Sequence, residues 1–171
     1  EGVMQQLQVL TKSHSLVTIE FLPGANPSVQ EAIERQLVAN TYKVSDQWIN
    51  DARLISYFTG ADACNQLSTI NVVFGDHILL KDAGAALVDV GQRKMICVDL
   101  RWEAIQPISD SFTVAAHLLN PNGELVAQYD SVPLGGFAPT SSWVPATLVH
   151  DRFGLVLPKD LSSGKYTLTI V

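Results

Sequence analysis

MICVDLRWEAIQPISDSFTVAAHLLNPNGELVAQYD, residues 95–130, carries the most regular hydrophobic alternation in this sequence. Its first part sets bulky apolar residues against charged ones on the opposite face: Ile96, Val98, Leu100 and Trp102 against Asp99, Arg101 and Glu103. A period of two predicts a half-buried strand with one face on a core. Residues 112–118 and 125–130 repeat the pattern, and the NPNG link at 120–123 favours a tight turn because Asn-Gly tolerates positive φ. The stretch therefore predicts an antiparallel meander.

The rest of the C-terminal half extends this meander. Short strands are predicted over residues 71–74, 78–80, 152–157 and 166–170, with turns between them. Residues 83–92 are weakly patterned, and residues 133–145 form a long connection. Several short strands with regularly spaced turns are typical of a β-sandwich. Residues 70–171 are therefore predicted to form an antiparallel β-sandwich, Ig-like or jelly-roll-like.

The N-terminal third has a different pattern. Residues 1–15 are expected to form a linker or a short helix, and residues 16–21 a strand that stops at Pro23-Gly24. Asn26 is a good N-cap and Pro27 suits the first helical position, so a helix is predicted over residues 27–39. Strands are predicted at 42–44 and 53–58. The order β-α-β-β predicts a small α/β lobe over residues 16–60, with a parallel pair joined by the helix. The polar segment 60–68 is expected to be the lobe boundary, and the fold class is α+β.

Composition excludes several function classes. The 171 residues suffice for one domain with a small extra lobe, and 47% hydrophobic content supports a sizeable core. A net charge of −6 with scattered basic residues argues against nucleic acid, which requires clustered Lys and Arg. No run of about 18 apolar residues predicts a membrane span, and the first residues lack the apolar region of a signal peptide.

The two cysteines, Cys64 and Cys97, leave the redox compartment open. Cys97 falls within a predicted strand, where a cysteine is usually a small buried thiol, and this is the favoured interpretation. A disulfide between them is the alternative, because sequence alone does not establish the distance that it needs.

No pattern of catalytic or metal-binding residues appears. His14, His77 and His150 lack ligand spacing, no elbow motif surrounds Ser141 and Ser142, and no cofactor is expected. A pair of glycosidase carboxylates must lie within about 5–10 Å of each other, and nothing in the sequence brings two together. The acidic residues Asp130, Asp151 and Glu103 are therefore expected to be solvated. The interpretation is a non-enzyme.

The aromatic residues and His117 supply the candidate binding site. Trp102 falls on the buried face of its strand and is expected in the core. Phe137 and Trp143 lie in the long connection, where they either stack on a sugar ring or cap the open end of the sandwich. His117 pairs across the hairpin with Gln128 or Asp130, as a ligand group or as a structural histidine.

A family resemblance rests on the segment HLLNPNGELVAQYDSVPLGGFAPTSSWVP and the residues that follow it. The chain resembles the C-terminal domain attached to bacterial membrane glycosyltransferases of the dolichyl-phosphate-mannose–protein mannosyltransferase-like class, over about residues 72–171. The matched positions are Trp102, His117, Gly123, Gln128, Asp130, Pro133, Pro139, Thr140, Trp143, Pro158, Gly164 and Tyr166. Where that family often has Gly-Glu, this chain has Ala146-Thr147.

The resemblance implies an extracytoplasmic accessory role at the cell membrane. In such proteins the catalytic acids belong to the membrane half, so membrane attachment would come only from parent segments outside this sequence. The expected partner is a glycan or a protein acceptor, bound at His117, Asp130, Phe137 and Trp143. The alternative is a structural or protein-interaction β-sandwich with no small-molecule site, and a free-standing hydrolase ranks last.

Overall fold

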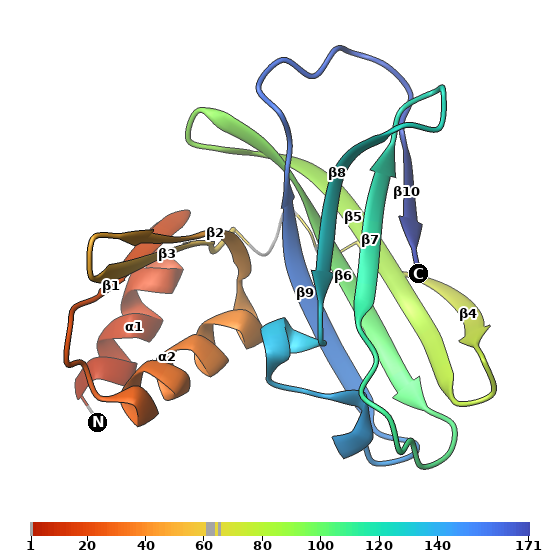
Figure 1. Cartoon of the computed structure of the whole chain (residues 1–171), viewed down its shortest axis with the longest axis horizontal. Helices are drawn as coiled ribbons and strands as arrows, with labels where there is room; N and C mark the ends of the chain where they lie inside the picture. Colours follow the sequence, from red (N-terminus) through yellow and green to blue (C-terminus); the bar gives the residue numbers. More distant parts are fainter. Residues whose placement is uncertain (1, 61–63, 65) are drawn as a thin grey trace.

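The computed structural model describes residues 2–60, 64 and 66–171 (Figure 1). Within these residues strands predominate, arranged in three antiparallel sheets with two α-helices near the N-terminus. The predicted α+β class is confirmed in its coarser part, because the described chain is mostly β with antiparallel sheets and its α-helices lie in the first third. Residues 61–63 and 65 of the predicted lobe boundary lie outside the described residues, and the division into domains stays a prediction.

The α/β lobe contains α1 (Gly2–Ser13), β1 (Leu16–Phe21), α2 (Pro27–Asn40), β2 (Tyr42–Ile49) and β3 (Ala52–Phe58). Its sheet has the order β1-β3-β2, and β3 pairs antiparallel with both neighbours. The predicted parallel pair is therefore wrong. The tight turn at Asn50, whose φ is +53°, folds β3 back on β2, and β3 then occupies the place beside β1.

The helices of this lobe form for local reasons. The side chain of Asn26 accepts a 2.9 Å hydrogen bond from the Ser28 amide, which caps α2 as predicted. Both helices cover the same face of the sheet (Figure 1). Their buried residues form one cluster with the sheet: Leu7, Phe21, Ile33, Leu37, Val38, Ile55 and Tyr57. Of the two alternatives for residues 1–15, the helix is the one observed, since Leu7 anchors α1 in this cluster.

Two further sheets pack face to face and form what we call the two-sheet unit. The four-stranded sheet has the order β4 (Ser68–Phe74), β5 (Ile78–Val90), β6 (Arg93–Ala104) and β9 (Leu148–Val156). The three-stranded sheet has the order β10 (Thr167–Ile170), β7 (Val114–Leu119) and β8 (Leu125–Ser131). Their shared core includes Leu100, Trp102, Val114, Ala116 and Phe153, so the expected core position of Trp102 is confirmed. The arrangement is sandwich-like.

Two strand boundaries differ from the predicted ones. Residues 78–90 form one long strand, where the sequence predicted a short strand and a weakly patterned segment. Phe112 was predicted to face the core within a strand, yet β7 begins only at Val114 and Phe112 is 47% exposed. The reason is a side chain: Thr140 Oγ1 accepts the Phe112 amide hydrogen at 2.9 Å, so that amide does not enter the ladder.

The α/β lobe packs on the outer face of the four-stranded sheet. Cys64 and Cys97 form a disulfide there, so the interpretation of Cys97 as a buried thiol is wrong. Around it lie residues from both parts of the chain: Tyr42, Phe58, Val90 and Met95. The lobe therefore buries Asp99, on the face of β6 that the sequence pattern set opposite the core, while Arg101 on the same face stays partly exposed. Gly154 marks a close approach of β9 to the lobe, since a Cβ there would stand 2.7 Å from the Lys43 carbonyl oxygen.

Candidate functional site

The structure brings two of the four predicted site residues together. His117 on β7 and Asp130 on β8 lie with Nε2 and Oδ1 3.7 Å apart, and both side chains are half-exposed. Gln128 donates a 2.9 Å hydrogen bond to the other oxygen of Asp130. This polar group lies on the solvent face of the three-stranded sheet, and ligand binding there stays a prediction.

The other two predicted residues lie elsewhere. Phe137 packs against the α/β lobe, where the guanidinium of Arg35 stands 4.8 Å from its ring centroid. Trp143 is only 7% exposed and belongs to the core of the two-sheet unit, and its indole nitrogen donates to the Ala138 carbonyl at 2.9 Å. Four residues predicted as one site thus occupy three places.

Trp143 does line a pocket, at the end of the two-sheet unit where β6 finishes. We call it the aromatic pocket; it has a volume of about 220 Å³. Its walls come from the β4–β5 turn, β6, the segment before β7 and the long connection: Phe74, Gly75, His77, Ile78, Trp102, Phe112, Thr113, Val114, Thr140, Trp143 and Val171. Concave sites with aromatic walls and a few polar groups are typical of small-molecule binding.

The rim of the aromatic pocket is held by Thr140. This residue is buried, donates a 2.7 Å hydrogen bond to the Asp110 carbonyl and accepts one from the Phe112 amide. Opposite, the rings of Phe74 and Trp102 meet edge to face at 5.6 Å. The aromatic walls are therefore positioned by tertiary contacts before any ligand arrives.

The polar groups of the aromatic pocket include N–H groups beside the hydroxyls of Thr113 and Thr140. The indole nitrogen of Trp102 is buried and has no hydrogen-bond partner among the described residues. Gln106 Nε2 lies 2.8 Å from His77 Nδ1; an amide nitrogen donates, so the neutral His77 ring carries its proton on Nε2. A buried unpaired donor costs stability, so Trp102 Nε1 would gain by meeting an acceptor.

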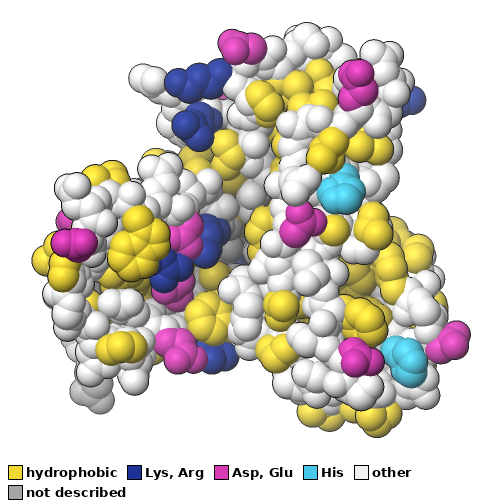
Figure 2. All heavy atoms as spheres, in the orientation of Figure 1, with side chains coloured by type: hydrophobic (Ala, Val, Ile, Leu, Met, Phe, Trp, Pro, Cys, Tyr) yellow, Lys and Arg dark blue, Asp and Glu magenta, His cyan; other side chains and the backbone are white. Residues whose placement is uncertain are grey.

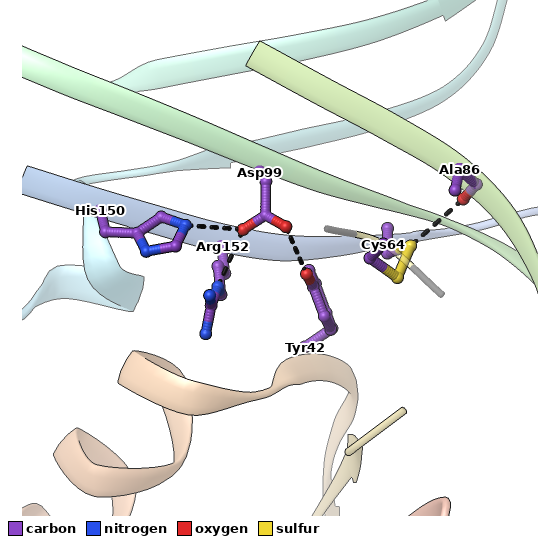
Figure 3. The surroundings of a disulfide bond; sticks show 7 residues. Tyr42, Cys64, Ala86, Asp99, His150 and Arg152 are labelled. Atoms are coloured by element: carbon purple, nitrogen blue, oxygen red, sulfur yellow. Dashed lines mark hydrogen bonds and ion pairs between the residues drawn. A yellow bond between two sulfur atoms is a disulfide. The ribbon is translucent and has the colours of Figure 1, made fainter. Parts of the chain in front are cut away.

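A cluster of titratable groups surrounds Asp99, whose side chain is fully buried (Figure 3). Its Oδ2 accepts a 2.6 Å hydrogen bond from Tyr42, and its Oδ1 lies 2.9 Å from His150 Nε2 and 2.8 Å from Arg152 Nε. Burial alone would raise the pKa of Asp99, but the hydrogen bonds from His150, Tyr42 and Arg152 outweigh it and hold that pKa below its usual value. Burial first, and then the hydrogen bond to Asp99, raise the pKa of Tyr42.

Asp151 is another buried acid, and its expected solvated position is wrong. It is 1% exposed; Oδ1 accepts the Leu134 amide at 2.8 Å, and Oδ2 has no hydrogen-bond partner among the described residues. Burial raises the pKa of Asp151 to about 6, despite the Leu134 hydrogen bond that lowers it. Its role in the fold is to hold the η2 turn (Leu134–Gly136) against β9.

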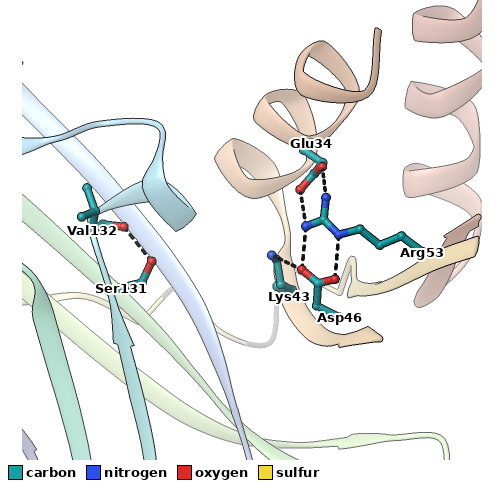
Figure 4. Close-up of polar contacts among 6 residues, drawn as sticks. All are labelled: Glu34, Lys43, Asp46, Arg53, Ser131 and Val132. Atoms are coloured by element: carbon teal, nitrogen blue, oxygen red, sulfur yellow. Dashed lines mark hydrogen bonds and ion pairs between the residues drawn. The ribbon is translucent and has the colours of Figure 1, made fainter. Parts of the chain in front are cut away.

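A third charged cluster stabilises the α/β lobe (Figure 4). Arg53 on β3 bonds Glu34 of α2 at 2.6 Å and Asp46 of β2 at 2.8 Å. Lys43 adds a 3.0 Å ion pair to Asp46, and these bonds, led by that from Arg53, lower the pKa of Asp46. The cluster joins helix and sheet.

Within the described part of the chain, no group of three His, Cys, Asp or Glu side chains is placed to hold a metal ion. Among the same residues, no helix is long and apolar enough to cross a membrane.

Sequence reasoning missed the residues that matter most in these clusters. Asp99 alternates with apolar residues like any solvent-facing strand residue, and Tyr42 lies 57 positions away. Neither the hydrophobic pattern nor the sequence spacing therefore indicates that the two side chains are in contact. For Phe112, the polar segment before it could have indicated an exposed ring.

Comparisons with family models, with curated proteins and with solved structures find no match to this chain.

Proposed function

We propose that this chain is a non-catalytic, extracytoplasmic accessory domain of a membrane glycosyltransferase-like protein, and that its aromatic pocket binds one sugar ring of a glycan or glycoprotein acceptor. The observation that carries the proposal concerns Trp102: its indole N–H has no hydrogen-bond partner among the described residues, and the side chain lines a pocket with four aromatic rings. Sugar rings present C–H faces that stack on aromatic rings, and their oxygens accept hydrogen bonds. The membrane-enzyme context rests on the sequence resemblance.

The aromatic pocket supports a single ring better than a long oligosaccharide. Its volume of about 220 Å³ is below that of typical drug-sized sites. Phe112, half-exposed at the rim, offers the accessible stacking face, while Trp102 and Trp143 form the buried walls. The surface pair His117–Asp130 lies on a different sheet face and would contact only more distant units of a larger glycan.

The compartment and the accessory role have separate support. A Cys64–Cys97 disulfide favours an oxidising, extracytoplasmic environment, because cytosolic thiols are kept reduced. Two hydrogen bonds of the Asp99 cluster join the α/β lobe to the two-sheet unit, from Tyr42 to Asp99 and from Arg152 to the Ala39 carbonyl, which supports a structural use. The face-to-face antiparallel sheets support an Ig-like or jelly-roll-like sandwich as the finer classification.

The test is a glycan array followed by titration of a hit, with Phe112→Ala as the site variant. Trp143→Ala is unsuitable because removing a buried indole leaves a cavity and costs roughly 3–5 kcal/mol of stability. Trp48→Ala is the matched control, since this tryptophan is 69% exposed on the α/β lobe. We expect Phe112→Ala to weaken binding at least tenfold and Trp48→Ala to leave it unchanged.

Two results would overturn the proposal. Binding that survives Phe112→Ala but is lost in Trp48→Ala would place the sugar on the α/β lobe. Folded wild-type protein that binds no glycan on the array would remove the sugar-binding function itself.

The second candidate is a structural or protein-interaction domain without a small-molecule site. One observation favours it: β4 is an edge strand and exposes Ile70, Val72 and Val73. Uncharged apolar edge strands pair readily with other chains. Under this reading the protein self-associates as its concentration rises, and Val72→Lys keeps it monomeric in light-scattering measurements. A wild-type protein that stays monomeric at high concentration contradicts self-association.

A further inference from the structure

A second concavity lies at the opposite end of β5 and β6 from the aromatic pocket. We call it the basic groove. It has a volume of about 690 Å³ and lies between the β5–β6 hairpin and the segment that links β9 to β10. The groove has an apolar floor and a positively charged rim. Nothing in this site is shared with the aromatic pocket, so the inference does not depend on the sugar-binding proposal.

The floor of the basic groove is apolar and comes from both sheets. Leu118 of β7 and Leu168 of β10 belong to the three-stranded sheet, and Ile96 of β6 belongs to the other. With Leu157 and Leu161 they form a cluster of their own between the sheets. The groove therefore opens into the space between the sheets and offers a place for an apolar chain.

The groove exists because the facing strands differ in length. β5 has 13 residues, whereas β10 has four. Ala85 and Leu87 pair with Val98 and Ile96 of β6, so they lie on the inner face of the sheet, yet both are exposed. The small side chain of Ala85 adds to the open space. The wall on the other side is braced, since the Tyr166 hydroxyl donates a 2.9 Å hydrogen bond to the Ser162 carbonyl.

The rim of the basic groove is cationic, in a chain whose net charge is −6. Arg93, Lys94 and Lys159 line it, and none lies within 4.0 Å of a described carboxylate. Asp89 stands opposite Lys94 in the β5–β6 ladder and Asp160 follows Lys159, but neither lines the groove. Figure 2 shows basic side chains at this hairpin end, beside an apolar surface. Positive rim and apolar floor together are complementary to an anion with an apolar tail.

We propose that the basic groove binds an anionic amphiphile, a single apolar chain that carries a phosphate headgroup. The chain lies on the floor of Leu118, Leu157 and Leu168, where each methylene removed from water contributes to binding. The headgroup meets Lys94, which shares the inner face of β6 with Ile96 and whose ammonium is a point charge for phosphate oxygens, while Arg93 and Lys159 add positive charge around the groove. The serine hydroxyls at 162 and 163 supply further donors.

The test titrates dodecyl phosphate, below its critical micelle concentration, into the full chain by calorimetry. Dodecyl maltoside shares the chain but is neutral, and inorganic phosphate shares the headgroup but has no chain. We expect dodecyl phosphate to bind at least tenfold more tightly than either, with an affinity that falls as salt rises. Anionic phospholipid vesicles form the fourth arm.

Two variants locate the site and one controls for charge. Lys94→Glu should weaken dodecyl phosphate binding at least fivefold, and Ala85→Phe should block the chain; both positions are exposed, so folding is retained. Lys12→Glu, which makes the same charge change on α1, should have no effect.

The proposal is overturned if dodecyl maltoside binds equally well, because the charged rim then has no role. It is likewise overturned if inorganic phosphate binds equally well, or if Ala85→Phe leaves binding unchanged. Binding to anionic vesicles without binding of monomeric dodecyl phosphate would replace the groove with a membrane-docking surface.

Discussion

The hydroxyl of Tyr42 donates a 2.6 Å hydrogen bond to Oδ2 of Asp99, across the joint between the α/β lobe and the two-sheet unit. Tyr42 opens β2, and Asp99 lies in the middle of β6. The other oxygen of the carboxylate meets His150 and Arg152, and Arg152 reaches on to the Ala39 carbonyl at 3.3 Å. One buried carboxylate therefore gathers partners from both parts of the chain.

Tyr42→Phe should destabilise the protein by about 1.5–3 kcal/mol, because it removes a hydrogen bond to a buried charge. Urea unfolding at pH 7 measures the change. Tyr57→Phe is the matched control: Tyr57 is equally buried, but its hydroxyl has no hydrogen-bond partner among the described residues. The control should be neutral or stabilising. Equal losses in both variants would show that the Tyr42–Asp99 bond contributes nothing beyond ring packing.

Asp151 should make the protein less stable as pH rises from about 4 to 6. Its pKa in the folded protein is raised from 3.8 to about 6 by burial, so the folded state holds the proton over this range while the unfolded state has released it. At about 1.4 kcal/mol per pKa unit, the loss is on the order of 2–3 kcal/mol and is complete above pH 6.

Asp151→Asn should flatten that part of the stability profile, because Asn cannot ionise and its side-chain oxygen still accepts the Leu134 amide. Urea midpoints at pH 4, 5, 6 and 7 for both proteins isolate the effect, since all other groups are common to them. Asp99 acts in the opposite sense: its pKa is lowered, so its contribution is lost only as pH falls below about 4. Parallel profiles would assign the pH dependence to other residues.

Reduction of the disulfide should destabilise the protein without removing a core side chain. Cys64 and Cys97 are 33 residues apart, and a closed loop of that size is worth about 3–4 kcal/mol through the entropy of the unfolded chain. Cys64→Ala with Cys97→Ala should therefore lower the unfolding midpoint in urea, and the wild type should match it once reduced in denaturant. Unchanged stability would mean that side-chain packing alone, without the disulfide, holds the α/β lobe on the two-sheet unit.

Gly154→Ala should destabilise by roughly 1–3 kcal/mol, because the added methyl group would overlap Met95 Sδ and the Lys43 carbonyl oxygen. The Met95 side chain can move, but the β2 backbone has to shift. Gly164→Ala is the control, since its methyl group would meet only Tyr166, at an ordinary 3.6 Å. Thermal unfolding compares the two, and equal midpoints would mean that the lobe is not seated on β9 at this point.

The local elements could be predicted because their signals are contained in neighbouring residues. Asn26 and Pro27 indicate where α2 begins, and the alternation of apolar residues from Ile96 to Trp102 indicates β6. The turn at 120–123 joins β7 to β8 as its residues require. Such signals depend on backbone preference and period, which a linear sequence carries in full.

The sequence pattern could not predict which segment covers each face of a strand. Alternation set Asp99 on the face away from the core, but the α/β lobe buries that position, and three donors then make a buried carboxylate tolerable. The aromatic pocket and the basic groove likewise depend on contacts between distant segments, such as Thr140 with Phe112 or β5 with the shorter β10.

The sequence by itself determined the regular strands such as β6, the turn between β7 and β8, and the capped helix, because hydrophobic period and turn chemistry act over a few residues. The tertiary structure alone decided the antiparallel order β1-β3-β2, the disulfide, the buried Asp99 and Asp151, and the two concavities. These features arise where segments tens of residues apart meet, and their free energy comes from desolvation and pairing across that contact, which no local pattern records.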